Sequence, residues 1–448
     1  MENLKKVVNK DLLYNNINLK DLAIEYSTPL KVTFLDVIKN RVIELKNSFD
    51  KAIYSTNYNG NFIFLNANKA NYGLEEIEES FKYSDGLETS SYYDLLLTFA
   101  IFLKYNEKDK YIVCNGIKDD NYLNKIVEIS ALGYKIIDII DSKDEYLKLK
   151  KMDANIEVGF RIHLSSLYSE DGDLIKDDRF GLTEEEFNYC LYDIKNTKMT
   201  LSTIHFHQRG FEYEKDKFEK NLVKVFKNYY YKAERIYTSV INFDIGGGTP
   251  LPLKGSFDYD EWALYVIKLI QNMSNELGIL VPNIISENGK YAQKDSTVNI
   301  YKVITTKYTD KDYPWMIVDS SPLIAMPEMY ALGEDILVEP INNIGDNMTK
   351  VRLGGLTCDC DDVYFEKDKG YILIPDNGTD QYIALIGTGS YQNSMNGKGG
   401  VHHCLLPEEK DILIYSDESS NIIKKVRHNI QSIEDIFKLI GLENSNNL

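Results

Sequence analysis

Cysteine, tryptophan and long apolar runs are scarce in this chain, and each shortage excludes a class of protein. The 448 residues include 5 cysteines and 2 tryptophans. The cysteines (Cys114, Cys190, Cys358, Cys360 and Cys404) are too few and too scattered for a disulfide framework. Cys358 and Cys360 are one residue apart, but no second close pair completes a zinc site, so we expect no metal. No stretch approaches the roughly 18 apolar residues that a membrane helix needs.

Basic residues are also in deficit. Lys and Arg total 51 against 69 Asp and Glu, which gives a formal net charge of −18. Such a surface repels nucleic-acid phosphates, so we expect no nucleic-acid partner. The acidity serves solubility in the simpler interpretation, and it would also attract cationic substrates. Residues 1–13 carry lysines but no apolar run, so they indicate no secretory signal and predict a cytoplasmic protein without membrane attachment.

Between about residues 50 and 290, short β-rich apolar runs alternate with amphipathic helical stretches, a pattern typical of parallel α/β proteins. Strands are predicted at residues 61–67, 84–87, 111–114, 135–139, 156–163, 201–206, 240–245 and 283–286. Helices are predicted at residues 74–81, 92–105, 121–132, 142–151, 183–195, 213–237 and 259–277. Strands and helices in this order predict a (β/α)8 TIM barrel.

After about residue 295 the pattern changes to strands separated by turns, without long helices between them. The strand-like segments lie at residues 298–305, 314–318, 336–340 and 371–375. Residues 27–35 are also strand-like and precede the first helix of the barrel. We therefore expect a barrel domain of residues 36–295 and a mainly β domain made of residues 1–35 and 296–448.

Four of the predicted strand ends carry residue types suited to a cofactor site. Barrel active sites lie at the C-terminal ends of the strands. Lys69 follows the first strand, His207 the sixth, three glycines the seventh and Glu287 the eighth; the glycines are Gly246, Gly247 and Gly248. At a buried strand end, Lys69 would be a desolvated nucleophilic amine, and the glycine amides would surround a phosphate. Glu287 would keep a pyridine nitrogen protonated.

Each of these residues has an ordinary explanation when it is taken alone. Most lysines are solvated, a triple glycine is often only a flexible turn, and a histidine usually has a partner in the core or at the surface. Glutamate is also common at helix N-termini. Their joint occurrence at four strand ends of one barrel predicts a cofactor site.

Taken together, these motifs resemble the fold-type III pyridoxal-phosphate decarboxylases, which act on ornithine, diaminopimelate or arginine and share their barrel with alanine racemase. The resemblance runs from about residue 19 to 406. The segment Asn68-Lys69-Ala70-Asn71 is similar to the family's cofactor-lysine segment, which implies that Lys69 binds pyridoxal 5′-phosphate covalently. The resemblance also implies that His207 stacks on the pyridine ring, that Glu287 contacts its nitrogen and that the three glycines hold the phosphate.

In the β domain, residues 355–360 (Gly-Leu-Thr-Cys-Asp-Cys) resemble the decarboxylase Cys-Asp motif. This implies that Cys358 reprotonates the intermediate and that Asp359 contacts the distal amine of the substrate, both in the active site of the other subunit of a homodimer. Asp361 and Asp362 offer further carboxylates to a cationic side chain. Nearby acids would raise the pKa of Cys358 and keep it a thiol. Tyr391 is similar to the family's tyrosine that reaches the cofactor phosphate.

Two motifs depart from the family pattern. Arg209 and Gly210 stand where the family has Gly-Ser, so Arg209 would replace a hydroxyl contact to the phosphate with a charged one. The glutamate motif continues through Gly289 to Lys290, where the family has an arginine. Lys290 would face the phosphate as a point charge without a bidentate fork.

Residues 86–88, 114–119, 357–359 and 389–392 favour the arginine branch, although the chain is shorter than typical bacterial arginine decarboxylases. The resemblance therefore implies decarboxylation of a basic amino acid, most simply arginine to agmatine in polyamine biosynthesis. Ornithine, lysine, diaminopimelate and carboxynorspermidine are alternative substrates. Diaminopimelate decarboxylases place an arginine before a proline to bind a distal carboxylate, whereas Met326 precedes Pro327 here.

Three other functions are compatible with parts of this pattern. A racemase on the same fold needs a second base, commonly a tyrosine from the partner, and the Cys-Asp motif argues against it. A non-catalytic regulator usually loses the lysine or the cofactor contacts. A metal-dependent barrel hydrolase predicts a His/Asp cluster at strand ends, where His205 and His207 are available.

Overall fold

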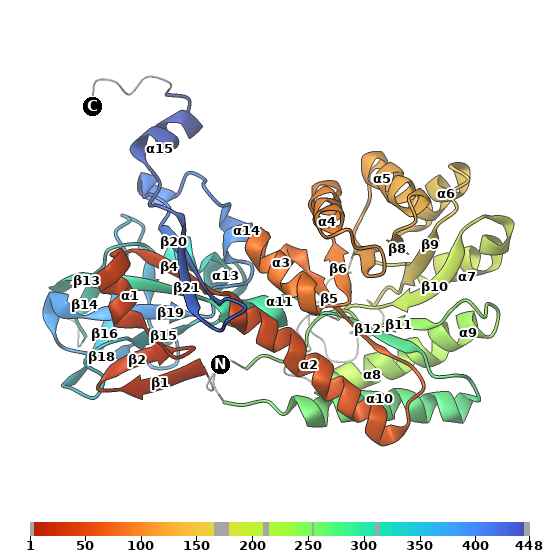
Figure 1. The fold of residues 1–448 in the computed structure, drawn as a ribbon, viewed down its shortest axis with the longest axis horizontal. Coiled ribbons are helices and arrows are strands. Elements are labelled where there is room, and N and C mark those ends of the chain that lie inside the picture. Colours follow the sequence, from red (N-terminus) through yellow and green to blue (C-terminus); the bar gives the residue numbers. More distant parts are fainter. Residues whose placement is uncertain (1–3, 165–178, 209–214, 253–254, 310–312, 443–448) are drawn as a thin grey trace.

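A barrel of parallel strands and a mixed β domain lie side by side in the computed structural model (Figure 1). The structure describes residues 4–164, 179–208, 215–252, 255–309 and 313–442. None of the helices described there is long and apolar enough to cross a membrane. The division of the chain at residues 35/36 and 295/296 stays a prediction.

Eight strands close the barrel, each parallel to its neighbours, and the last pairs with the first. They are β5 (Phe62–Ala67), β6 (Gly86–Thr89), β7 (Tyr111–Cys114), β8 (Lys135–Ile140), β9 (Glu157–Arg161), β10 (Thr200–His205), β11 (Asn242–Asp244) and β12 (Asn283–Glu287). All eight predicted strands are present, so the TIM-barrel prediction is confirmed. Because the strands are buried on both faces, they read as continuous apolar runs.

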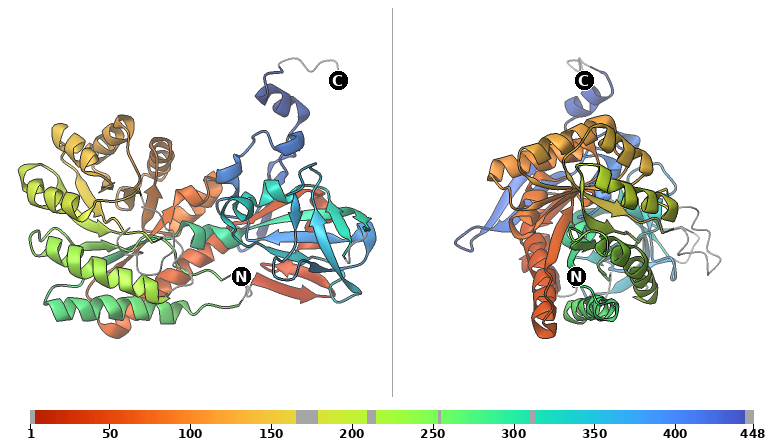
Figure 2. Two further views of the ribbon diagram at one scale, coloured as in Figure 1. Left: turned by 180° about the vertical axis from the view of Figure 1, so that it is seen from behind. Right: turned by 90° about the vertical axis from the view of Figure 1, so that its right-hand side faces the viewer.

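Helices surround the strands on the outside, as the end-on view in Figure 2 shows. They are α2 (Leu35–Thr56), α3 (Leu74–Tyr83), α4 (Tyr92–Tyr105), α5 (Asp120–Ala131), α6 (Lys143–Lys151), α7 (Glu184–Asp193), α8 (Lys215–Val225), α9 (Tyr231–Glu234) and α10 (Tyr259–Leu277). The single helix predicted over residues 213–237 is interrupted by a π-helical turn, Phe226–Tyr230, between α8 and α9. The stacked rings of Phe226 and Tyr230 both pack against Phe243 of β11 there.

Side chains of each strand alternate between two apolar layers. In β5, Phe62 and Phe64 pack toward the helices, whereas Ile63 and Leu65 belong to the cluster that fills the barrel. The filling cluster consists of Ile63, Leu65, Val113, Ile137, Ile139 and Ile285. This cluster gives the barrel a packed apolar core below the strand ends.

The β domain is built around β4 (Leu30–Phe34), which pairs with strands far away in the sequence. It lies between β13 (Thr297–Lys307), which is antiparallel to it, and β20 (Lys410–Ser416), which is parallel. The strand-like segment at residues 27–35 thus joins this sheet. The remaining strands are β14 (Trp315–Val318), β15 (Leu337–Pro340), β16 (Met348–Gly354), β17 (Val363–Tyr364), β18 (Ile372–Pro375), β19 (Tyr382–Ile386) and β21 (Ile422–His428).

Several short elements complete this part of the molecule. They are β1 (Lys5–Val8), β2 (Asp11–Tyr14), β3 (Ile17–Asn18), α1 (Leu19–Tyr26), α11 (Gly289–Gln293), α12 (Pro322–Ala325), α13 (Pro327–Leu332), α14 (Gln392–Asn396) and α15 (Ile433–Leu439). The β domain also reaches the barrel mouth. Asn71, just after β5, donates to the carbonyl of Gly389 at 2.9 Å, and the amide of Tyr391 donates to the carbonyl of Ala70 at 2.6 Å.

Candidate active site

Lys69 lies in a 3-10 turn, Asn68–Ala70, directly after β5. Its Nζ is 3.2 Å from Oε1 of Glu88, a fully buried carboxylate in β6. Protein atoms surround the lysine, yet 38% of its side-chain surface is accessible because it faces the open barrel mouth. Burial disfavours the charged amine, but Glu88 and Glu287 outweigh it and raise the pKa of Lys69. The amine is therefore held as an ammonium against Glu88.

Glu88 links Lys69 to the opposite side of the mouth. Its Oε1 also accepts hydrogen bonds from Ser90 at 2.8 Å and from Nδ2 of Asn115 at 2.9 Å. The same Nδ2 donates to Oε1 of Glu287 at 2.7 Å. A continuous polar chain thus runs from the lysine of β5 to the glutamate of β12.

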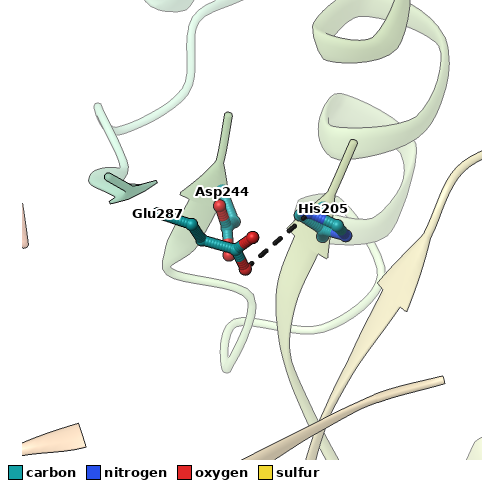
Figure 3. Close-up of side chains that lie close together, drawn as sticks. All are labelled: His205, Asp244 and Glu287. Atoms are coloured by element: carbon teal, nitrogen blue, oxygen red, sulfur yellow. Dashed lines mark ion pairs between the residues drawn. The ribbon is translucent and has the colours of Figure 1, made fainter. Parts of the chain in front are cut away.

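Glu287 is one of three buried polar side chains from adjacent strands, with Asp244 of β11 and His205 of β10 (Figure 3). His205 Nε2 is 3.9 Å from Glu287 Oε1. Burial and Glu88 raise the pKa of Glu287 to about 7, and burial and Glu287 raise the pKa of Asp244 further above its ordinary value. Burial and Arg161 lower the pKa of His205. The histidine is therefore neutral, and the two acids lie in a site that disfavours a negative charge on both at once.

The glycine loop after β11 packs against this cluster. Gly246 and Gly248 have φ values of 67° and 98°, which side-chain-bearing residues rarely adopt. A Cβ on Gly247 would lie 2.6 Å from the carbonyl oxygen of Glu287. The Gly247 amide donates to Nδ1 of His207 at 3.3 Å, and burial lowers the pKa of His207 to about 3. The loop thus holds a neutral imidazole and leaves no room for a side chain.

Of the other residues expected near a cofactor, Gly289 lies beside the lysine turn, whereas Lys290 pairs with acids of the β domain. A Cβ on Gly289 would lie 2.3 Å from the Ala67 carbonyl, so Gly289 permits close packing beside the lysine turn. Lys290 pairs with Glu334 at 3.0 Å and with Glu328 at 3.7 Å, which are acids of the β domain. Arg209 lies outside the described residues.

Tyr391 comes to the barrel mouth from the β domain in a left-handed conformation, φ 63°. Burial raises the pKa of its hydroxyl, and the nearby Lys69 opposes this shift. The phenol of Tyr391 therefore lies close enough to the lysine for their charges to interact.

The Cys-Asp motif lies apart from this cluster. No hydrogen bond or ion pair joins Cys358 or Asp359 to the barrel-mouth residues of the same chain, among the residues that the structure describes. Cys358 is exposed, and its pKa is raised as expected, but mainly through its contact with Cys404 and only lastly through Asp359. Asp361 is also exposed.

Asp362 differs from the expectation that it offers a carboxylate to the substrate. It is buried, and its carboxylate accepts hydrogen bonds from the hydroxyls of Ser321 at 2.8 Å and Thr357 at 2.6 Å. A carboxylate used in this way fixes the Cys-Asp loop and is not free to bind a cation.

No role in a cofactor site was predicted for five buried polar residues, although His205 was named as a candidate residue of a metal-dependent hydrolase. They are Glu88, Asn115, Arg161, His205 and Asp244. Each stands at or directly after the end of a predicted strand, so the signal was a polar residue at the C-terminal end of an apolar run.

Unpaired polar atoms gather at this mouth. Within the described part of the chain, the buried atoms without a hydrogen-bond partner include Glu88 Oε2, Asn115 Oδ1, Asp244 Oδ2 and both ring nitrogens of His205. Buried polar atoms normally have partners, so they fit a polar ligand. The ligand atoms of His205, Asp244 and Glu287 lie within 4.8 Å of one another, a spacing that also suits a metal ion. The accessible lysine and the side-chain-free glycine loop fit an aldehyde cofactor with a phosphate better, because a metal site needs neither.

Comparison with known proteins distinguishes these possibilities. The pyridoxal-binding domain of the pyridoxal-dependent decarboxylases matches residues 67–294. A biosynthetic arginine decarboxylase of Phocaeicola vulgatus is 28% identical over 368 residues, which cover 76% of this chain and 54% of that protein. The chain thus spans about half the length of the curated relatives that it matches.

Solved structures agree on the fold. The biosynthetic arginine decarboxylase of Campylobacter jejuni superposes with a TM-score of 0.84 at 18% identity, over 98% of this chain and 88% of that one. A diaminopimelate decarboxylase of M. jannaschii in complex with L-lysine gives a TM-score of 0.81 at 17% identity, over 97% and 96% of the two chains. Since the pyridoxal-binding domain matches more than half of the residues, the chain belongs to the pyridoxal-dependent decarboxylase family, whose cofactor is pyridoxal phosphate.

Proposed function

We propose that this protein decarboxylates a basic amino acid, with arginine as substrate and agmatine as product, as a step toward polyamines. The observation that carries the proposal is the polar chain Lys69–Glu88–Asn115–Glu287 facing the glycine loop. When bound, pyridoxal phosphate supplies an electron sink for the electrons that carbon dioxide leaves behind. Lys69 would hold the cofactor, and His207 would pack on its ring.

The two ends of the polar chain, at Lys69 and at Glu287, would contact different parts of the cofactor. Glu88 holds the ammonium of Lys69, which must lose a proton before its amine is a nucleophile. At the other end, the amide of Asn115 donates to Oε1 of Glu287 at 2.7 Å and stabilises the ionised form of this carboxylate. An ionised Glu287 can then accept a hydrogen bond from a protonated pyridine nitrogen.

The phosphate end is supplied by the loop after β11 and by the β domain. Gly246, Gly247 and Gly248 would line the phosphate, with the hydroxyl of Tyr391 on the side of Lys69. The amides of Gly246 and Gly247 donate to Asp244 Oδ1 and His207 Nδ1, so they would bind the phosphate only if they leave these acceptors. Lys290 would add positive charge there only if its pairs with Glu328 and Glu334 open. Arg209 would be a further phosphate contact.

Protonation of the product carbon requires an acid. We assign this step to the thiol of Cys358 and recognition of the distal cation to Asp359, with Asp361 as a further acid. Among the described residues, no hydrogen bond or ion pair joins Cys358 or Asp359 to the site of its own chain, so we propose a homodimer in which these residues serve the partner's barrel.

Met326 supports a substrate without a second carboxylate. Its side chain is fully buried in the apolar core of the β domain, so this position offers no cation. An unpaired substrate carboxylate in a closed site costs several kcal/mol, on the order of a thousandfold in selectivity. The relatives named as arginine decarboxylases favour arginine over ornithine and lysine.

A panel assay tests the substrate. Carbon dioxide release is measured with arginine, ornithine, lysine, diaminopimelate and carboxynorspermidine, and enantiomer exchange is followed in parallel. Arginine should give the highest kcat/KM, diaminopimelate roughly a thousandfold less, and no racemisation should occur. Faster release from diaminopimelate than from the other substrates would contradict the argument from Met326.

A labelling experiment tests the cofactor residue. The purified protein should absorb visible light, and borohydride should bleach this band and fix the cofactor to Lys69. Lys69→Ala should give no fixed label, whereas Lys290→Ala should keep it. A label on any other lysine would contradict the assignment.

A further inference from the structure

Cys358 and Cys404 face each other across two loops of the β domain. They are 46 residues apart in the sequence, yet their Sγ atoms are 3.5 Å apart. Cys358 follows β16, and Cys404 lies in the 3-10 turn His403–Leu405. Both thiols are exposed.

Groups around Cys404 favour its thiolate. The backbone amide of Cys358 donates to its Sγ at 3.4 Å, and Nδ1 of His403 lies 3.0 Å away. Nε2 of the same ring is 3.5 Å from the carboxylate of Asp359, which orients the imidazole. Hydrogen bonds from Cys358 lower the pKa of Cys404, whereas contact with Cys404 raises the pKa of Cys358. Cys404 is thus the better nucleophile of the pair, and Cys358 is the thiol that can react with it afterwards.

We propose that Cys358 and Cys404 form a reversible disulfide when the protein meets a hydroperoxide. The Cys404 thiolate attacks the peroxide, the O–O bond breaks, and a sulfenic acid forms while the departing hydroxide takes up a proton to become water. The Cys358 sulfur, after losing its proton, then attacks the Cys404 sulfur. The S–O bond breaks and a second water leaves. Two thiols and one hydrogen peroxide thus give one disulfide and two waters.

The geometry permits this reaction with small movement. The sulfur atoms must approach from 3.5 Å to the roughly 2.05 Å of a disulfide, which rotation of two exposed side chains can supply. Cys360 is a natural comparison. It is also exposed, but its Sγ lies within 4.8 Å of carboxylate oxygens of Asp359 and Asp361, and no contact joins it to a second thiol among the described residues.

The consequence for catalysis depends on the proposed function. Cys358 is there the proton donor, and a disulfide carries no thiol proton. Oxidation should therefore slow amine formation by roughly 10²–10⁴-fold, the usual contribution of a general acid. The same protein would lose activity in the presence of peroxide and regain it after reduction.

The test treats the cofactor-loaded protein with equimolar hydrogen peroxide and maps its cysteines. We expect the loss of two free thiols per chain, a Cys358–Cys404 linked peptide in a digest made without reduction, and recovery of both thiols with dithiothreitol. Cys360→Ser should form the same linked peptide. Unchanged thiols, a link that includes Cys360, or a link between two chains would overturn the proposal.

Activity measurements separate this proposal from the proposed function. Cys404→Ser should keep the basal rate of carbon dioxide release and lose the rapid, dithiothreitol-reversible inactivation. A Cys404→Ser protein that peroxide inactivates reversibly at the wild-type rate would also overturn the proposal. A linked peptide that forms without any change in decarboxylation would leave the disulfide standing and contradict the role of Cys358 as proton donor.

Discussion

The carboxylate of Glu287 is buried beside a second acid, which makes the stability of the cofactor-free protein depend on pH. Its pKa is raised to about 7. A carboxyl group with a raised folded pKa stabilises the fold fully below its unfolded pKa, near 4.3, and loses this contribution as the pH rises through the folded value. The free energy of unfolding should therefore fall between about pH 4 and pH 7, by at most about 4 kcal/mol from this residue. Glu287→Gln should flatten the decline in urea titrations. Parallel curves for the two proteins would contradict this.

Lys118 is a buried cation whose loss should destabilise the barrel. Its Nζ is 3.1 Å from Asp138 of β8 and 2.9 Å from Glu145 of α6, and its side chain has no accessible surface. Lys118→Met leaves two buried carboxyl groups without their cation, which costs about 3–5 kcal/mol. Lys148→Met removes an exposed ion pair with Asp120 and should change little. Urea unfolding of the two variants measures the difference, and equal midpoints would contradict the assignment.

Single site residues could be predicted from the sequence where they stand at the end of a predicted strand. Lys69 and Glu287 were predicted because each follows an apolar run and the barrel brings such ends together. The burial of Asp362 depends on partners 5 and 41 residues away, and no local pattern reports such contacts. The approach of Cys404 to Cys358 likewise depends on two loops of the folded β domain.

The glycine loop after β11 requires glycine for reasons that can be tested with alanine. A Cβ at Gly247 meets the backbone of β12 at 2.6 Å, so the loop must move. Such overpacking costs about 1–3 kcal/mol, and we expect the dissociation constant of pyridoxal phosphate to rise roughly tenfold or more in Gly247→Ala.

A control separates this effect from ordinary backbone strain. Gly133, after α5, has φ 82°, and a Cβ there meets no atom within 4 Å. Gly133→Ala should lower stability slightly without changing cofactor affinity, because only the left-handed backbone is penalised. Equal affinities for both variants, measured by fluorescence titration, would rule out a phosphate-binding role of the loop.

Elements were predictable where burial gives a simple pattern. The barrel strands and most of their helices match because buried strands are continuous apolar runs and the helices are amphipathic. Strand β21 was not predicted because its side chains are mostly exposed and polar. It is a strand because it pairs with β20, which is antiparallel to it. The strands β1 to β3 were not predicted because each is only two to four residues long, too short to show a repeating pattern.

The proposed shared site of a homodimer is a property of the whole molecule and can be tested by complementation. Lys69→Ala and Cys358→Ala dimers should each be nearly inactive. After subunit exchange, about half of the dimers are mixed, and each mixed dimer has one site with both residues intact. The mixture should recover about one quarter of the wild-type rate of amine formation. No recovery after proven exchange would contradict the shared site.

The central strand of the β domain also determines the order in which the molecule can fold. β4, residues 30–34, pairs with β13 and β20, which begin at residues 297 and 410. At ribosomal speeds β4 leaves the exit tunnel on the order of tens of seconds before β20. The barrel, whose strands follow one another in the sequence, can close during this interval. During synthesis, β4 is therefore an unpaired apolar strand and a binding segment for chaperones until β13 appears, and one of its edges stays open until β20 appears.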